Sequence, residues 1–339
     1  MRLDELVIQG VDERIKRLIS DAGEQVHIYD MMKYHLGWLD ENLKPASFHP
    51  GKRIRPRFVF LTCAAAGAPM EDAIAPAAAV ELVHNFSLVH DDIQDRSRYR
   101  RHRRTVWDIW GDAQAINAGD GLLVLAQLAL TDDEKATPQR KARGLRILNI
   151  ACRLLCEGQY LDLDYEQRPS VSLDEYYFMI ERKTGALLEA SCHLGALYGS
   201  NDEGVITEYA RFGRYLGLAF QAQDDYLGIW GDPRETGKPA ADDIISKKKA
   251  LPMVRLLNVA TGADHERLNA ILSRPGPTTQ DETSEILDLM ERYQIVRFVA
   301  SEVARNTDLA LAALEAAKPE PQAGEELASL CRKLTIRTS

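Results

Sequence analysis

Hydrophobic residues recur at intervals of three and four along almost the whole chain. Clear examples are Ala77 to Val89, Leu145 to Leu155 and Tyr209 to Phe220, and sustained alternation is absent. Because an α-helix repeats every 3.6 residues and a strand every two, this pattern predicts an all-α fold. Segments rich in Pro, Gly or short polar residues predict interruptions at 45–51, 67–69, 131–138, 168–169, 231–239, 274–279 and 319–324.

The domain organisation predicted from the sequence is simple. A chain of 339 residues is long enough for one large or two ordinary domains. It shows no repeat, no low-complexity tract and no shift in composition, so we expect a single domain over 1–339. The N-terminus lacks the apolar stretch of a signal peptide. Gly121 to Leu130 has half the roughly 20 residues of a membrane span, so we expect a buried core helix and no membrane span.

The charge balance limits the classes of partner. There are 42 Lys and Arg against 51 Asp and Glu, which gives a formal charge of −9. This excludes a general nucleic-acid binder, because such proteins bind largely by neutralising phosphates with Lys and Arg. Any anion site must therefore be local. The five cysteines are scattered and lack CxxC spacing, which favours reduced thiols and a cytoplasmic location.

The first candidates for chemistry are Asp91, Asp92 and Asp95, directly after an apolar helical stretch. Residues four apart on a helix differ by only about 40° in direction, so Asp91 and Asp95 share a face with Asp92 beside it. By itself such a group is as typical of a solvated helix end as of a functional site.

A second acidic group favours the functional interpretation. Gln221, Asp224 and Asp225 also follow an apolar stretch, and their spacing places them on one side of a helix. Two such faces at one cavity would offer several oxygen ligands without His or Cys. That donor set favours Mg²⁺, which typically bridges protein carboxylates to substrate phosphates.

Basic residues accompany both acidic groups. Arginine forms paired hydrogen bonds to phosphate oxygens, so arginines beside a metal site favour a metal–diphosphate complex. A solvated charged loop or a nucleic-acid patch is the alternative for the arginine run alone. The residues concerned are Lys52, Arg53, Arg55, Arg96, Arg98, Arg100, Arg101, Arg103, Arg104, Lys183, Lys238, Lys247, Lys248 and Lys249.

The order of the motifs resembles the trans-isoprenyl diphosphate synthases, the polyprenyl synthetase family. The motifs, between about residues 30 and 260, are GKRIRP, HNFSLVHDDIQDRSRYRR, NAGDGLL, GQYLDL, KTGALL and FQAQDDYLGIWGDPRETGKP. The resemblance implies an isoprenoid synthase fold of about ten or more helices around a deep central cavity, a homodimer and a Mg²⁺-dependent reaction. An allylic diphosphate (dimethylallyl, geranyl or farnesyl) ionises, and the double bond of isopentenyl diphosphate attacks its carbocation.

The resemblance also implies roles for individual residues. Isopentenyl diphosphate is expected at Lys52, Arg55, His84 and Arg101. The allylic diphosphate is expected at Arg100, Lys183, Lys238 and Lys248. Up to three Mg²⁺ ions are expected at Asp91, Asp92, Asp95, Asp224 and Asp225, and polar groups near the carbocation at Thr184 and Gln221. The expected catalytic residues are Asp91, Asp92, Asp95, Arg100, Lys183, Thr184, Gln221, Asp224 and Lys238.

Two positions depart from the family pattern. Gly228 stands where the second motif commonly has its last aspartate, and His102 stands where a glycine usually follows the arginine doublet. The first departure leaves open the role of Asp225 and of a third Mg²⁺. A class I terpene cyclase is one alternative function, but GKRIRP and His84 argue against it because a cyclase binds no isopentenyl diphosphate.

Product length in the family depends on residues just before the first aspartates. Phe86 and Ser87 lie five and four residues before Asp91. One Phe, a small Ser and an uninserted DDIQD look more like a geranylgeranyl (C20) than a farnesyl (C15) diphosphate synthase. We therefore expect C20, with C15 as the alternative.

A partner subunit without catalytic activity is the remaining alternative from another class. Such subunits typically lose aspartates of the first group, and all three are present here. At the C-terminus, Arg332, Lys333 and Arg337 are candidates for closing the site over diphosphate, although an exposed basic tail is the commoner case.

Overall fold

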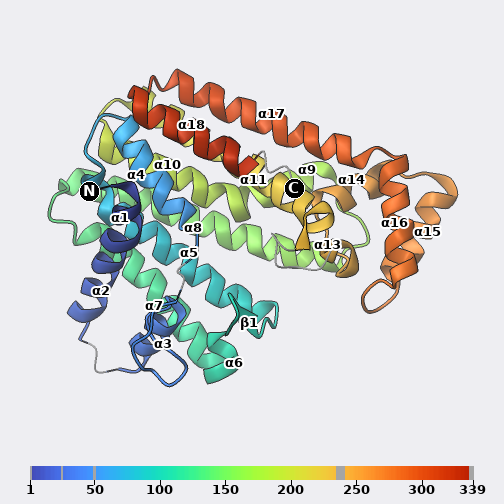
Figure 1. Ribbon diagram of the computed structural model, residues 1–339, viewed down its shortest axis with the longest axis horizontal. Coiled ribbons are helices and arrows are strands. Elements are labelled where there is room, and N and C mark those ends of the chain that lie inside the picture. The colour runs from blue at the N-terminus through green and yellow to red at the C-terminus, as the bar shows by residue number, and fades with distance from the viewer. Residues whose placement is uncertain (1, 24–25, 49–50, 234–240, 336–339) are drawn as a thin grey trace. The chain divides into compact units, whose positions relative to one another are not determined.

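The computed structural model describes residues 2–23, 26–48, 51–233 and 241–335. Helices form nearly all of its regular structure, as the hydrophobic pattern predicts (Figure 1). Each predicted interruption that the structure describes overlaps a connection between helices, although residues 321–324 already belong to the last helix. The chain divides into two compact units. Unit 1 contains residues 1–152, 190–207 and 319–324, and unit 2 contains 153–189, 208–318 and 325–339.

Four helices pass from one unit to the other, and the remaining elements belong to one unit. The shared helices are α8 (Pro138–Gln167), α10 (Ala186–Gly199), α11 (Glu203–Trp230) and α18 (Pro321–Thr335). Unit 1 also has α1 (Leu3–Glu5), η1 (Leu6–Gly10), α2 (Val11–Asp21), α3 (Ile28–His35), α4 (Ile54–Ala65), η2 (Met70–Ala73), α5 (Ile74–Gln94), β1 (Tyr99–Arg100), β2 (Arg103–Arg104), α6 (Val106–Trp110) and α7 (Asp112–Thr131). Unit 2 also has α9 (Leu173–Ile180), η3 (Glu181–Gly185), α13 (Asp242–Ile245), α14 (Leu251–Val259), α15 (Gly262–Ser273), α16 (Gln280–Arg292) and α17 (Ile295–Ala316).

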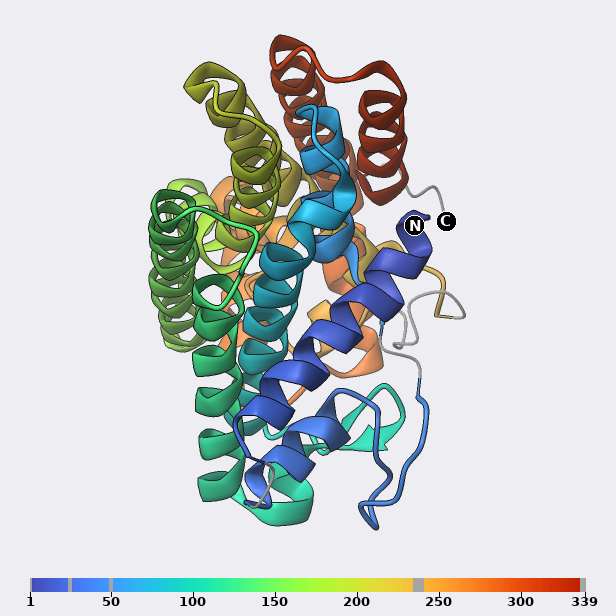
Figure 2. The ribbon, with the colours of Figure 1, turned by 90° about the vertical axis from the view of Figure 1, so that its left-hand side faces the viewer.

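Helix α5 is the centre of unit 1. It packs against α7 along much of its length, and α2 and α4 also contact it (Figures 1 and 2). Its residues 75–83 are all buried, and most of them are alanine or valine. A helix that is apolar on every side is stable only inside a core, so the sequence itself places α5 at the centre. The first aspartates follow at its C-terminal end.

A short β-hairpin in the arginine run is a feature of unit 1 that the all-α prediction missed. Tyr99 pairs with Arg104 and Arg100 pairs with Arg103. The two turn residues, Arg101 and His102, have φ angles of 51° and 62°. Positive φ at both central residues is typical of the tight turns that favour glycine, which explains the usual family glycine at the position of His102.

Helix α7 is longer than the ten-residue core segment that we expected. Among the described residues it is the one helix that is long and apolar enough, by length and composition, to cross a membrane. In its apolar stretch of 18 residues, 44% is buried in the protein. Core helices meet the same criterion. One side of α7 packs against α5, whereas Ile116, Val124 and Leu128 are exposed.

In unit 2 a π-helical turn, η3, interrupts the path from α9 to α10 and carries Lys183 and Thr184. Its backbone passes very close to α8, because a β-carbon placed on Gly158 would lie 2.2 Å from the Lys183 nitrogen. Ser172 and Glu175 form a capping box that fixes the start of α9. These contacts fix the backbone that presents Lys183 and Thr184.

Candidate active site

The first aspartates lie at the C-terminal end of α5, where Asp95 is the capping residue. Asp92 is buried, and the Nε of Arg100 lies 2.9 Å and 3.1 Å from its two carboxylate oxygens. Burial raises the pKa of Asp92, and the hydrogen bond from Arg100 opposes that rise. The structure therefore joins Asp92 and Arg100 directly, whereas Asp95 is exposed.

The arginine run divides into structural and candidate binding residues. Arg103 donates to the carbonyl oxygens of Tyr34 and Leu39, each at 2.9 Å, and stacks on the ring of Tyr34. Arg96 and Arg104 form ion pairs with Asp112 and Asp108. These three arginines hold the hairpin and its neighbours in place.

Arg101 instead lies beside the residues expected to bind isopentenyl diphosphate. Its guanidinium lies against Gly51, where an added β-carbon would be 2.5 Å from Nη2. Burial and the guanidinium groups of Arg55, Arg101 and Arg100 hold the pKa of His84 well below its usual 6.5. The buried Nε of Arg55 has no hydrogen-bond partner. Unit 1 thus brings Arg55, His84 and Arg101 together, and the unsatisfied donor of Arg55 fits an anionic ligand. Lys52 is exposed.

Sequence reasoning missed a buried carboxylate beneath these cations. Glu81 is 2% exposed; its Oε1 accepts a 3.0 Å hydrogen bond from Asn85 and lies 3.9 Å from the Nε of Arg53. Burial lowers the pKa values of Arg55 and Arg101, and the charge of Glu81 opposes this effect. A lone carboxylate inside the apolar stretch of α5 is the sequence signal that identifies it.

His35 was also missed, because it lies far from the motifs in sequence. Burial lowers the pKa of this imidazole to about 3, with further contributions from Arg100, Arg101 and Arg103. A hydrogen bond between His35 and the side chain of Asn85 acts in the opposite direction. His35 and His84 are therefore neutral near pH 7 and add no positive charge to the arginines.

Unit 2 contains a cavity of about 170 Å³. Polar and charged side chains form much of its wall, together with a few apolar ones. Its lining residues are Asp162, Tyr176, Met179, Ile180, Lys183, Gln221, Asp224, Asp225, Lys248, Lys249 and Ala250. The structure thus brings together five residues that the sequence predicted from three motif regions: Lys183, Gln221, Asp224, Asp225 and Lys248. Thr184 joins them through a 2.6 Å hydrogen bond to Oε1 of Gln221.

Asp224 and Asp225 differ sharply although they are adjacent. Asp224 is exposed, whereas Asp225 is 2% exposed. Burial raises the pKa of Asp225 to about 6 despite the nearby Lys248 and the hydrogen bonds that it accepts. The two carboxylates therefore do not present equivalent ligands to a metal ion.

The lysines of the second motif region also have distinct partners. Lys183 pairs with Asp162, which the sequence pattern alone did not identify. Burial alone would lower the pKa of Lys248, but the carboxylates of Asp225, Asp243, Asp162 and Asp224 raise it overall. Lys248 is therefore a half-buried ammonium group that its acidic neighbours keep positively charged, so it could bind a phosphate oxygen.

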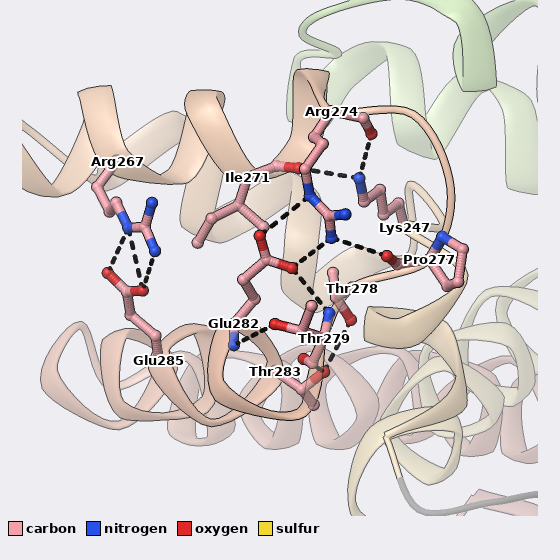
Figure 3. A network of polar contacts seen from close by, with 10 residues as sticks. All are labelled: Lys247, Arg267, Ile271, Arg274, Pro277, Thr278, Thr279, Glu282, Thr283 and Glu285. Atoms are coloured by element: carbon pink, nitrogen blue, oxygen red, sulfur yellow. Dashed lines mark hydrogen bonds and ion pairs between the residues drawn. The ribbon is translucent and has the colours of Figure 1, made fainter.

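Lys247 faces another way and has a structural contact (Figure 3). Its Nζ donates to the carbonyl oxygen of Ile271, 2.9 Å away at the end of α15, and to that of Arg274. Arg274 in turn pairs with Glu282, which also caps α16 (Figure 3). This network anchors the segment that follows α13, and Lys248 is the next residue along it.

The remaining predicted residues lie on α5, on α18 or outside the described residues. Lys238 and Arg337 lie outside the described residues. Arg332 and Lys333 are exposed on α18. Phe86 and Ser87 are both buried on α5; the ring of Phe86 packs edge to face on His90, and the hydroxyl of Ser87 donates to the carbonyl oxygen of His84.

Comparison with known proteins assigns the chain to a family. The family model described as Polyprenyl synthetase matches residues 37–290. The chain belongs to the polyprenyl synthetase family. A (2E,6E)-farnesyl diphosphate synthase of Mycobacterium tuberculosis (strain ATCC 25618 / H37Rv) is 43% identical over 282 residues, which cover 83% of this chain and 78% of the relative. A geranylgeranyl diphosphate synthase of the same strain is 39% identical over 288 residues, 82% of this chain and 81% of the relative.

Solved structures agree with the family assignment. A polyprenyl synthetase from Streptomyces coelicolor A3(2) aligns with a TM-score of 0.87 and 36% identity, covering 99% of this chain and 100% of that one. A geranylgeranyl pyrophosphate synthetase from Pyrococcus horikoshii aligns with a TM-score of 0.86 and 34% identity, covering 100% of both chains. The predicted isoprenoid synthase fold and enzyme class are confirmed: the chain is an isoprenyl diphosphate synthase, a trans-prenyltransferase.

The structure explains why this family member has Gly228 in its second motif. A β-carbon at Gly228 would lie 2.2 Å from Oδ2 and 2.6 Å from Cγ of Asp243. The carboxylate of Asp243, on α13, thus occupies the space beside α11 that a side chain at this position would enter. Asp243 is buried and is one of the acidic neighbours of Lys248. The chain therefore has a carboxylate at this place, but Asp243 supplies it.

The donor set of the aspartates fits magnesium bound together with substrate. Within the described residues, no three His, Cys, Asp or Glu side chains form a cluster that would hold a metal ion. Mg²⁺ usually keeps several waters and binds through one or two protein carboxylates plus substrate phosphates. Asp91 and Asp95, four residues apart at the end of α5, could supply oxygen ligands of that kind, and so could the exposed Asp224.

Restoring the family aspartate is predicted to be harmful. In Gly228→Asp the new carboxylate would enter the space of Asp243 and add a like charge beside it. We expect a cost of about 1–3 kcal/mol, measured as a lower Tm, together with reduced turnover. Removing the obstructing carboxylate in Gly228→Asp/Asp243→Ala is expected to recover part of the Tm. A Gly228→Asp variant with unchanged or higher Tm and turnover would contradict this explanation.

Proposed function

We propose that this enzyme condenses isopentenyl diphosphate with an allylic diphosphate, depends on Mg²⁺ and releases mainly geranylgeranyl diphosphate (C20). Farnesyl diphosphate (C15) is the alternative product. The observation that carries the proposal is the pair of charged sites: Arg55, His84 and Arg101 in unit 1, and the cavity with Lys183 and Lys248 in unit 2. Two diphosphate substrates require two such sets of cations.

Arg55 and Arg101, with Lys52 beside them, would bind the diphosphate of isopentenyl diphosphate. The buried Nε of Arg55 lacks a partner, so an incoming phosphate oxygen would satisfy it. His84 is neutral, and its imidazole can therefore donate one hydrogen bond without adding charge. Glu81 below these groups keeps the arginines charged in a buried setting.

The allylic diphosphate would be held by Arg100, Lys183 and Lys248, with Lys238 also expected. Asp91, Asp95 and Asp224 would hold Mg²⁺, which neutralises negative charge on the leaving diphosphate. When the allylic carbon–oxygen bond breaks, its electron pair stays with the diphosphate. Fixed cations stabilise this charge more in the transition state than in the ground state. The residues proposed for isopentenyl diphosphate and those proposed for the allylic diphosphate would act in the same reaction.

The remaining cation on the allylic carbon needs oxygen atoms rather than N–H groups near it. Thr184 and Gln221 are the polar residues predicted for this position, and they share a hydrogen bond in unit 2. The double bond of isopentenyl diphosphate then supplies two electrons for the new carbon–carbon bond. Loss of one proton restores a double bond, and the released diphosphate is basic enough to accept that proton.

The residues before Asp91 support the longer product. Ser87 lies four residues before Asp91, on nearly the same side of α5, and its small side chain leaves space there. Phe86, one residue earlier, packs on His90, with the two ring centroids 5.0 Å apart. A C15 chain would therefore meet no aromatic ring at Ser87 and could grow to C20.

The chain-length proposal predicts the products of the wild type and of one substitution. Wild-type enzyme given farnesyl and isopentenyl diphosphates is expected to make the C20 product, as chromatography of the products would show. Ser87→Phe is expected to shift the main product to C15, because a ring below Asp91 shortens the space. Phe86→Ala, which enlarges the same region, is expected to lengthen products. A wild type that fails to extend farnesyl diphosphate would overturn the C20 assignment.

A second prediction separates an enzyme from a partner subunit without activity. Asp91→Ala removes a proposed metal ligand, so turnover of labelled isopentenyl diphosphate is expected to fall by about 10³-fold or more, in the range of electrostatic contributions to catalysis. Chelating Mg²⁺ from the wild type is expected to have the same effect. If Asp91→Ala keeps wild-type turnover, this site does not carry the reaction.

A homodimer and a single domain over 1–339 complete the proposal, with the cytoplasmic location still a prediction. Ile116, Val124 and Leu128 expose apolar area on α7, which supports self-association. Sedimentation equilibrium is expected to give about twice the 38.0 kDa of one chain. Val124→Glu should reduce this mass towards one chain, and a monomeric wild type would refute the dimer.

A further inference from the structure

Four polar side chains in unit 2 form a continuous chain of hydrogen bonds. The hydroxyl of Tyr176 donates to Oδ2 of Asp225 at 2.5 Å. Nε2 of Gln221 donates to Oδ1 of Asp225 at 2.8 Å, and Oε1 of Gln221 accepts from the hydroxyl of Thr184 at 2.6 Å. The residues come from α9, α11 and η3. The chain thus connects a buried tyrosine with the two residues expected near the carbocation.

The direction of each hydrogen bond follows from the carboxylate. An ionised Asp225 only accepts, so both Tyr176 and Gln221 must donate to it. The amide of Gln221 then has its nitrogen towards Asp225 and its oxygen towards Thr184. Because Thr184 donates its only hydroxyl proton to that oxygen, its remaining lone pairs are available to a ligand. One carboxylate therefore sets the orientation of two further groups.

Asp225 is satisfied by the protein itself. Besides Tyr176 and Gln221, the backbone N–H of Leu251 donates to Oδ2 at 2.7 Å, at the start of α14. Three donors from three helices thus surround a carboxylate that is 2% exposed. A metal ligand must instead direct lone pairs at the ion, as the exposed Asp224 is able to do. The geometry separates the two neighbouring aspartates by role.

We propose that Asp225, supported by Tyr176, is a positioning residue that keeps the oxygens of Gln221 and Thr184 directed at the allylic cation, and is not a Mg²⁺ ligand. This inference rests on the proposed prenyl transfer, since only a reaction with a developing cation requires that orientation. Tyr176 acts because it donates to Asp225 from the core, where it is 1% exposed.

The decisive substitution is Asp225→Asn, which keeps the shape but replaces one oxygen by an N–H₂ group. If the oxygen of the new asparagine accepts from Tyr176 and Leu251, its nitrogen faces Gln221. The Gln221 amide must then turn over to offer its oxygen to that nitrogen. Its own N–H₂ group would now lie towards Thr184 and the cation, with the wrong polarity. We expect kcat to fall by at least about tenfold, while KM for both diphosphates stays within about twofold of wild type.

A second substitution is expected to repair the first. Gln221→Glu alone places two carboxylates side by side and should also lower kcat. In Asp225→Asn/Gln221→Glu the new carboxylate accepts from both the new asparagine and Thr184, so an oxygen again faces the cation. The double variant is expected to exceed both single variants in kcat by about tenfold. If the two single substitutions lowered kcat only by disturbing the structure, their effects would add, and the double variant would have a lower kcat than either single variant.

The Mg²⁺ dependence distinguishes positioning from metal binding. The concentration of Mg²⁺ at half-maximal rate is expected to be unchanged in Asp225→Asn and Tyr176→Phe, and to rise at least about tenfold in the matched variant Asp224→Asn. Tyr176→Phe keeps the ring in the core and loses only the hydroxyl, so it is also expected to lower kcat with KM unchanged. If the thermal transition of Asp225→Asn shows that this variant does not fold, Tyr176→Phe provides the test instead.

The outcomes separate this inference from the proposed function. A wild type that forms no prenyl diphosphate from any allylic substrate would overturn both. With an active wild type, the inference alone fails if Asp225→Asn raises the Mg²⁺ requirement as Asp224→Asn does. It also fails if the double variant is no faster than its better parent, or if Tyr176→Phe has wild-type kcat.

Discussion

A carboxylate removed from water must find donors or cations, and this requirement organises both units. In unit 2, Asp225 obtains its donors from α9, α11 and α14, so it joins three helices around the cavity. In unit 1, Glu81 on the core helix α5 lies beside Arg53 and Asn85. Leaving such a group unpaired costs several kcal/mol, so the surrounding side chains have little freedom to reorient. The side chains of the candidate site derive their fixed positions from these buried partners.

The same constraint fixes the positions of the cationic side chains in the absence of substrate. Arg100 pairs with Asp92 and Lys183 pairs with Asp162, while Lys248 has acidic neighbours. Each cation is thus held in place by a carboxylate before a diphosphate binds. In the proposed reaction a diphosphate, which carries more negative charge than these single carboxylates, would compete for the cations, and Mg²⁺ would compensate the charge of the aspartates. Fixed charges of this kind need little reorganisation when charge develops during the reaction.

The sequence predicted the features that depend on local pattern. Helical periodicity located the helices, and the spacing of Asp91 and Asp95 predicted that they share one helix face; in the structure they stand at the C-terminal end of α5. Contacts between distant residues were not predictable in this way: neither the Tyr176–Asp225 bond nor the position of Asp243 beside Gly228 has a local signal. The hairpin was missed because its strands are two residues long, and composition favoured helix. Thus the sequence identified the charged residues, but only packing shows which of them are structural.

The central claim is that an ionised Asp225 fixes the polarity of Gln221 and Thr184. Neutron diffraction from deuterated crystals of the wild type would test it most directly, because it locates the exchangeable hydrogens that distinguish an amide nitrogen from its oxygen. We predict deuterium on Nε2 of Gln221 directed at Asp225, deuterium on the Thr184 hydroxyl directed at Oε1 of Gln221, and none on Asp225 near pH 8. An amide turned the other way, or a deuteron bound to Asp225 at that pH, would contradict the claim.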